Sequence, residues 1–106
     1  MIFKTGCVTF NLVDQIFTLL MDDSILDQIF REEAGRDCIV TTVRNGTHAT
    51  WSFHYKGKAL DCRANDLTKA QQQRILRRLK EALPGYDVVL HGKGSNIHYH
   101  IEWDPK

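Results

Sequence analysis

Residues 52–63 read SFHYKGKALDCR, and residues 98–102 read HYHIE. The first stretch places His54 and Asp61 on either side of a glycine, and the second repeats histidine at alternate positions. Imidazole nitrogen and carboxylate oxygen are ligands that zinc prefers, and a catalytic zinc site uses three of them with a fourth position open to water. His54, Asp61 and one of His98 or His100 supply that number, so the sequence predicts a zinc site.

The two stretches are expected to lie on strands. Residues 59–63 and 97–103 both have the alternation of a half-buried strand. Because side chains alternate between the two faces of a strand, His98, His100 and Glu102 share one face, and the apolar residues between them face the core. Cys62 should likewise point away from Asp61, which gives it a structural role.

The first third of the chain and the segment after it follow a helical and then a strand pattern. Apolar residues at helical spacing predict one short helix over residues 12–20 and another over residues 25–30. Ser24 and Asp27 resemble an N-terminal capping pair for the second helix, and Gly35 can end it in a left-handed conformation. The β-branched stretch 38–43 predicts a strand.

The second half predicts a helix followed by a hairpin. Thr68 and Gln71 form a capping box for a helix with a basic outer face, which is expected to be a solvated surface. Pro84-Gly85 ends this helix, and residues 86–90 and 97–103 read as two strands joined by a glycine-rich loop. The order of elements predicts an α+β domain in which helices pack on an antiparallel sheet.

Composition restricts the class of protein. A chain of 106 residues with 42% hydrophobic residues can bury one core, which predicts a single domain over residues 1–106 and a monomer. A net charge of +1 argues against nucleic acid or a membrane as the main partner. No apolar run reaches the roughly 20 residues of a membrane span, and no signal-peptide pattern is present, so the chain is expected to be cytoplasmic as synthesised. Cys7, Cys38 and Cys62 have spacings that predict free thiols.

The first stretch resembles a motif of peptidase family M15, the zinc D-Ala-D-Ala carboxypeptidases and L-Ala-D-Glu endopeptidases. These enzymes share their fold with the Sonic hedgehog signalling domain. Their motif is Ser-x-His-x-x-Gly-x-Ala-x-Asp, and each fixed position is satisfied here by Ser52, His54, Gly57, Ala59 and Asp61. The resemblance runs from about residue 39 to residue 106 and is nearest to the short, single-domain peptidases of tailed bacteriophages.

The resemblance implies roles for individual residues. It assigns zinc to His54, Asp61 and His100, and it makes His98 a neighbour that orients substrate or a ligand. It further implies three roles near the first stretch: a grip on a substrate carboxylate by Arg44, a hydrogen bond to the substrate peptide by Ser52, and a position near the metal for His48.

The sequence departs from the family pattern at the residue that would act as the general base. Relatives place a carboxylate shortly before the last ligand, but residues 88–98 contain none. Either His91 or Glu102 takes the proton from the zinc-bound water, or the site binds zinc without efficient turnover. His91 is slightly favoured because its unperturbed pKa lies near 6.5, whereas Glu102 can also serve as a partner that positions a ligand.

The expected function is therefore that of a zinc metallopeptidase that cuts the stem peptide of peptidoglycan, as a carboxypeptidase or an endopeptidase, in phage lysis or wall remodelling. Access to the wall would depend on a phage holin or on lysis. One alternative is a non-catalytic zinc-binding domain that acts in recognition or assembly. The other is a structural phage component in which the ligand set is a relic.

Overall fold

The computed structural model of the chain describes residues 1–3, 19, 21, 23–42 and 59–103. The predicted helix over residues 12–20 lies almost entirely outside this part, as do Cys7, Arg44, His48, Ser52, His54 and Gly57. The described elements are β1 (Ile2–Phe3), α1 (Ile25–Ala34), β2 (Ile39–Thr42), β3 (Ala59–Arg63), α2 (Lys69–Ala82), β4 (Tyr86–His91) and β5 (His98–Trp103), with a 3-10 turn at Gly94–Asn96.

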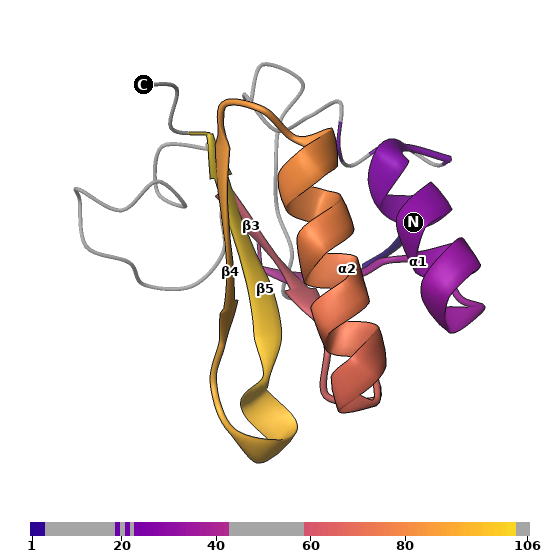
Figure 1. Cartoon of the computed structure of the whole chain (residues 1–106), viewed down its shortest axis with the longest axis vertical. Helices are drawn as coiled ribbons and strands as arrows, with labels where there is room; N and C mark the ends of the chain where they lie inside the picture. The colour runs from indigo at the N-terminus through magenta and orange to yellow at the C-terminus, as the bar shows by residue number, and fades with distance from the viewer. Residues whose placement is uncertain (4–18, 20, 22, 43–58, 104–106) are drawn as a thin grey trace.

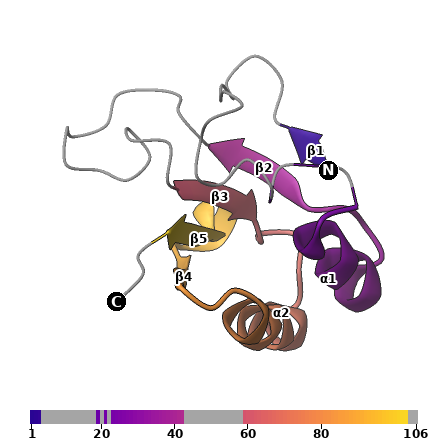
Figure 2. The same cartoon turned by 90° about the horizontal axis from the view of Figure 1, so that it is seen from above.

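The strands form one sheet in the order β1-β2-β3-β5-β4. Neighbouring strands from β2 to β4 are antiparallel, and β1 pairs with β2 in parallel. Figure 2 shows α1 and α2 on the same side of this sheet, and Figure 1 shows α2 running alongside β4 and β5. The α+β class is confirmed, as are the bounds predicted for β3. The short strand β1 was not predicted.

The side chains of β5 alternate between a core side, which faces α1 and α2, and the opposite side, which we call the open face because no described helix covers it. Tyr99 and Ile101 are fully buried. The ring of Tyr99 meets Phe30 of α1 edge to face at 5.9 Å, and its hydroxyl donates to the carbonyl oxygen of Gln72 in α2 at 2.7 Å. The alternate residues His98, His100 and Glu102 lie on the open face, opposite the two described helices, as predicted.

The capping box of α2 is confirmed. The backbone N–H of Gln71 donates to Thr68 Oγ1 at 3.1 Å, and the N–H of Thr68 donates to Gln71 Oε1 at 2.9 Å. The basic face of this helix is not only a solvated surface, because Arg74 and Arg78 form ion pairs with Glu33 and Glu32 of α1. These pairs join the two helices along their exposed edges.

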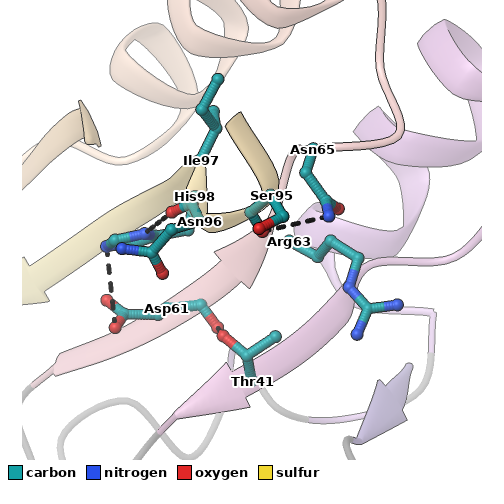
Figure 3. A pocket seen from close by; sticks show the side chains of 8 residues that line it. All are labelled: Thr41, Asp61, Arg63, Asn65, Ser95, Asn96, Ile97 and His98. Atoms are coloured by element: carbon teal, nitrogen blue, oxygen red, sulfur yellow. Dashed lines mark hydrogen bonds and ion pairs between the residues drawn. The ribbon is translucent and has the colours of Figure 1, made fainter. Parts of the chain in front are cut away.

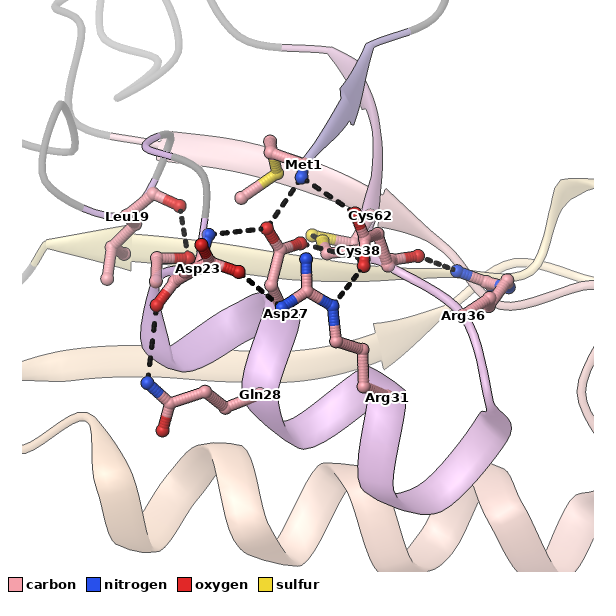
Figure 4. Close-up of polar contacts among 11 residues, drawn as sticks. Met1, Leu19, Asp23, Asp27, Gln28, Arg31, Arg36, Cys38 and Cys62 are labelled. Carbon is pink, nitrogen blue, oxygen red and sulfur yellow. Dashed lines mark hydrogen bonds and ion pairs between the residues drawn. The ribbon is translucent and has the colours of Figure 1, made fainter.

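The capping pair predicted for α1 is wrong. Ser24 is the N-cap residue, but its hydroxyl donates to the carbonyl oxygen of Leu19 at 3.0 Å and caps no helical N–H. The Asp27 side chain is buried and instead accepts from the N–H of Cys38 at 3.0 Å and pairs with the Met1 amino group at 2.5 Å (Figure 4). Gly35 ends the helix at φ 71°, as predicted.

The two described cysteines are free and fully buried. The sulfur atoms of Cys38 and Cys62 lie 3.1 Å apart beneath the sheet, and burial raises the pKa of Cys62 well above its ordinary value. The sequence predicted that the thiols are free and that the Cys62 side chain points to the face of β3 opposite Asp61. No helix in the described ranges is both long and apolar enough to cross a membrane.

Candidate metal centre

The pairing of β3 with β5 brings Asp61 and His100 together. The two residues are 39 positions apart in the sequence and are direct cross-strand partners in the sheet. His100 Nδ1 lies 2.9 Å from Asp61 Oδ1, and His98 Nε2 lies 3.9 Å from the other carboxylate oxygen of Asp61. One carboxylate therefore lies between two imidazoles on the open face of the sheet.

Two carboxylates, those of Asp61 and Glu102, lie next to the ring of His100. Its second ring nitrogen, Nε2, lies 3.4 Å from Glu102 Oε1, and its side chain is about three-quarters buried, with 23% exposed. The hydrogen bond to Asp61 raises the pKa of His100 above its usual value of 6.5, against an opposing effect of burial. Two carboxylates around one imidazole favour a cation at this position, either a proton or a metal ion.

The ring of His98 is oriented by the hairpin. Its Nδ1 lies 2.7 Å from the carbonyl oxygen of Asn96. Because a carbonyl oxygen only accepts hydrogen bonds, Nδ1 carries the proton in the neutral ring, and Nε2 presents its lone pair on the side of Asp61. Metal-binding histidines typically donate such a hydrogen bond from the ring nitrogen that does not bind the metal.

Gly92 allows the hairpin to take this shape. Its φ is 95°, and a Cβ atom at this position would lie 2.3 Å from the carbonyl oxygen of Asn96. A larger residue would therefore displace the same carbonyl group that orients His98. The glycine-rich sequence predicted a loop here but not this contact, because the contact depends on the 3-10 turn at Gly94–Asn96.

The two candidate bases lie at different places on the open face. His91 is exposed, is the cross-strand partner of His98, and stacks on it with ring centroids 6.1 Å apart. Glu102 instead contacts His100. Asp87 of β4 is the cross-strand partner of Glu102 and was missed in the sequence. The alternation of β4 combined with the register of the hairpin is the signal that could have found it.

A polar pocket of about 230 Å³ adjoins Asp61 and His98 (Figure 3). Its walls come from β2, β3 and the tip of the β4–β5 hairpin. They include Thr41, Asp61, Arg63, Asn65, Ser95 and His98. Arg63 was not among the predicted site residues, although its place two residues after Asp61 puts both side chains on the same face of β3.

Five of the nine predicted site residues are thus described, and all five lie on the open face of the sheet: Asp61, His91, His98, His100 and Glu102. Arg44, His48, Ser52 and His54 lie outside the described residues. Among the residues that the structure does describe, no three His, Cys, Asp or Glu side chains are arranged to hold a metal ion. Asp61 and His100 supply two adjacent donors.

Comparison with known proteins found no matching family model, no matching curated protein and no matching solved structure.

Proposed function

We propose that the chain is a zinc-dependent peptidase that hydrolyses a peptide bond in the stem peptide of peptidoglycan, with a fold like that of the hedgehog domain and the family M15 peptidases. The observation that supports this most directly is the contact between Asp61 and His100. The resemblance assigns both residues to zinc, and His100 Nδ1 lies 2.9 Å from Asp61 Oδ1 although 39 positions separate the two residues in the sequence.

The donor chemistry of this pair fits zinc, which takes carboxylate oxygen and imidazole nitrogen. Asp61 and His100 would hold the ion together with His54, which the motif supplies as the third ligand. Bound zinc polarises a scissile carbonyl and acidifies water. Glu102 contacts His100 at 3.4 Å and would hold its ring in place, while His98 would orient the substrate.

The remaining roles follow from the resemblance. Arg44 would bind a substrate carboxylate, Ser52 the adjacent peptide group, and His48 would lie near the metal. Either His91 or Glu102 would accept the proton from the attacking water. The two candidates differ in their contacts, because His91 stacks on His98 and Glu102 contacts the proposed ligand His100.

The test combines zinc content with the release of amino groups from purified peptidoglycan and from synthetic stem peptides. We expect stoichiometric zinc and cleavage in the wild type, and loss of both in His54→Ala, Asp61→Asn and His100→Ala. Arg77→Gln, at an exposed arginine of α2, is the control and should keep both. A wild-type protein that takes up no zinc would contradict the proposal and leave a structural phage component with a relic ligand set.

The same assay identifies the base through His91→Gln and Glu102→Gln. Loss of a general base lowers the rate by about 10²–10⁴-fold while zinc remains bound. Loss of a residue that only positions a ligand weakens metal binding by about 10–100-fold. The variant that keeps zinc but loses turnover therefore names the base.

A non-catalytic zinc-binding domain, acting in recognition or assembly, is the second candidate. It is favoured by the lack of an Asp or Glu in residues 88–98, where the related peptidases carry their base. Stoichiometric zinc without cleavage of peptidoglycan or of stem peptides would support this candidate over the peptidase.

A further inference from the structure

The strand β4 forms one edge of the sheet and lacks the features that usually protect such an edge. It lies at the end of the row of strands, with β5 on one side and no described strand on the other (Figure 2). Its six residues, Tyr86–His91, pair with β5 in continuous register and include neither proline nor lysine. An open edge strand of this kind is a template for the addition of a further strand.

The backbone of β4 offers hydrogen bonds along this edge. The N–H of Ala64, just after β3, donates to the carbonyl oxygen of Ile97 at 3.1 Å, so the backbone of Ile97 points toward β3. Because backbone groups alternate in direction along an antiparallel strand, His100 bonds to β4, where its partner is Val89. The residues on either side of Val89 therefore direct N–H and C=O groups out of the edge. These residues are Val88 and Leu90.

The side chains of β4 on the open face are complementary to a second copy of the same strand. Asp87, Val89 and His91 share this face, and Val89 at its centre is 42% exposed. Two copies related by a twofold axis normal to the sheet run antiparallel and keep their open faces on the same side. When the axis passes beside Val89, each Val89 meets its copy, and each Asp87 carboxylate faces the His91 imidazole of the partner subunit. Such cross-strand pairs stabilise a sheet on both sides of the apolar centre.

The same register satisfies the backbone. Val88 of each chain lies opposite Leu90 of the partner subunit, and each of these two pairs exchanges two hydrogen bonds. A register centred on Val88 would instead require the N–H of Tyr86, which already donates to the carbonyl oxygen of Leu83 at 3.1 Å. A register centred on Leu90 would extend the pairing beyond the end of the strand.

We propose that the chain forms a homodimer in which two copies of β4 pair antiparallel in the register centred on Val89 and join their sheets across the edge. Chain length and composition led to the expectation of a monomer, because they do not reveal an open strand edge. The dimer does not depend on the proposed peptidase function. It would add to that function by placing Asp87 of the partner subunit beside His91, one of the two candidate bases.

The first test is analytical ultracentrifugation of the whole chain over a range of concentrations. A single strand pair is smaller than the standard interface of about 1,600 Å², so we expect a reversible dimer whose share rises with concentration. Val89→Asp places two carboxylates against each other at the twofold axis and should raise the dissociation constant at least about 10-fold.

Two variants are the controls for Val89→Asp. Val89→Thr keeps a β-branched side chain at the axis and should retain the dimer. Met21→Asp changes another exposed apolar residue, which lies outside β4, and should leave the dissociation constant unchanged. A wild-type protein that stays monomeric at every concentration, or a Val89→Asp variant that dimerises as well as the wild type, would overturn the inference.

Cross-linking tests the register. The two Val89 residues form a pair without mutual hydrogen bonds, whose Cα atoms lie about 4.5 Å apart, within reach of a disulfide. In a Cys7→Ser background, Val89→Cys should therefore give a linked dimer with oxidised glutathione. Asp87→Cys and His91→Cys should each stay unlinked alone and give a linked heterodimer when mixed. Linkage of Asp87→Cys to itself as fast as that of Val89→Cys would contradict the proposed pairing.

Amide hydrogen exchange distinguishes a second copy from other occupants of the edge. Exchange at Val88 and Leu90 should slow at least about 10-fold between dilute and concentrated protein, whereas Val89, bonded to β5, stays protected throughout. Equal protection of all three at the lowest concentration would mean that another segment of the chain covers the edge, and the inference would be wrong. It would also be wrong if the protein stayed monomeric and these amides were protected only by an added synthetic stem peptide, since the edge would then bind an extended peptide.

Discussion

Arg36 connects several parts of the described chain. Its guanidinium forms a two-point ion pair with Asp66 at 2.7 and 2.8 Å, lies 5.1 Å from the ring centroid of Phe30, and donates to the carbonyl of Arg63. It therefore links α1 and the segment before β2 to β3, the strand that lines the polar pocket. The ion pair is half-exposed, since the Asp66 side chain is 45% exposed.

Asp66→Asn should remove part of the stability that the protein has at neutral pH. The hydrogen bond from Arg36 lowers the pKa of Asp66 from its ordinary 3.8. A carboxyl group with a lowered pKa in the folded state stabilises the fold above about pH 4, and this contribution disappears as the pH falls through the folded-state pKa. We expect Asp66→Asn to cost about 0.5–1 kcal/mol at pH 7, because exposure weakens the pair.

Urea unfolding at pH 7 and at pH 3 measures this effect. The difference between wild type and Asp66→Asn should shrink at the lower pH. Glu81→Gln, at an exposed carboxylate of α2 without an ion-pair partner in the described ranges, should cost little at either pH. A constant cost of Asp66→Asn at both pH values would contradict the assignment.

At the scale of elements, α2 depends on its first turn. The Thr68 hydroxyl satisfies the N–H of Gln71, one of the donors that a helix start leaves without a partner. Thr68→Ala should lower the free energy of unfolding by about 1 kcal/mol, whereas Thr68→Ser keeps the accepting oxygen and should cost less than half of that. Chemical denaturation of both variants checks this. Equal losses would show that the methyl group of Thr68, and not the cap, stabilises the helix.

Elements whose signal is local could be predicted from the sequence, and those that depend on distant partners could not. The capping box of α2 and the alternation of β5 lie within a few residues, so the shared face of His98, His100 and Glu102 followed directly. Asp27 was misassigned because one of its acceptor roles is fixed by the N–H of Cys38, 11 residues away. The two-residue strand β1 is too short to have a pattern of its own.

In the candidate site too, contacts that depend on strand pairing could not be predicted from the sequence. The resemblance predicted that Asp61 and His100 would both bind zinc, and the register of β3 with β5 brings them into contact. Arg63 and Asp87 carry no motif. They reach the open face only through the pairing of strands, and the pocket around Arg63 also needs the 3-10 turn of the hairpin. The sequence alone does not specify that turn.

At the scale of the whole molecule, Cys38 and Cys62 report on the integrity of the core. Both side chains are completely buried, and burial keeps Cys62 in its unreactive thiol form. In a Cys7→Ser background, we expect Ellman's reagent to modify the native protein only as fast as it unfolds, and to modify two thiols at once in denaturant. Lys80→Cys in the same background is the control and should react immediately, because Lys80 is exposed.

Rapid modification of either thiol in the folded Cys7→Ser protein would contradict this packing. It would mean that the layer between the sheet and the helices opens without global unfolding. Slow modification with the same rate as unfolding would instead show that the two thiols are protected by one cooperative unit.

The order of the strands also determines when the candidate metal centre can exist during protein synthesis. β5 is the last of the described strands to leave the ribosome, yet it lies between β3 and β4 in the sheet. Before it is translated, Asp61 has neither His98 nor His100 beside it, and β3 and β4 have no strand to join them. The nascent chain therefore completes its central strand and assembles its proposed ligand pair in a single late event.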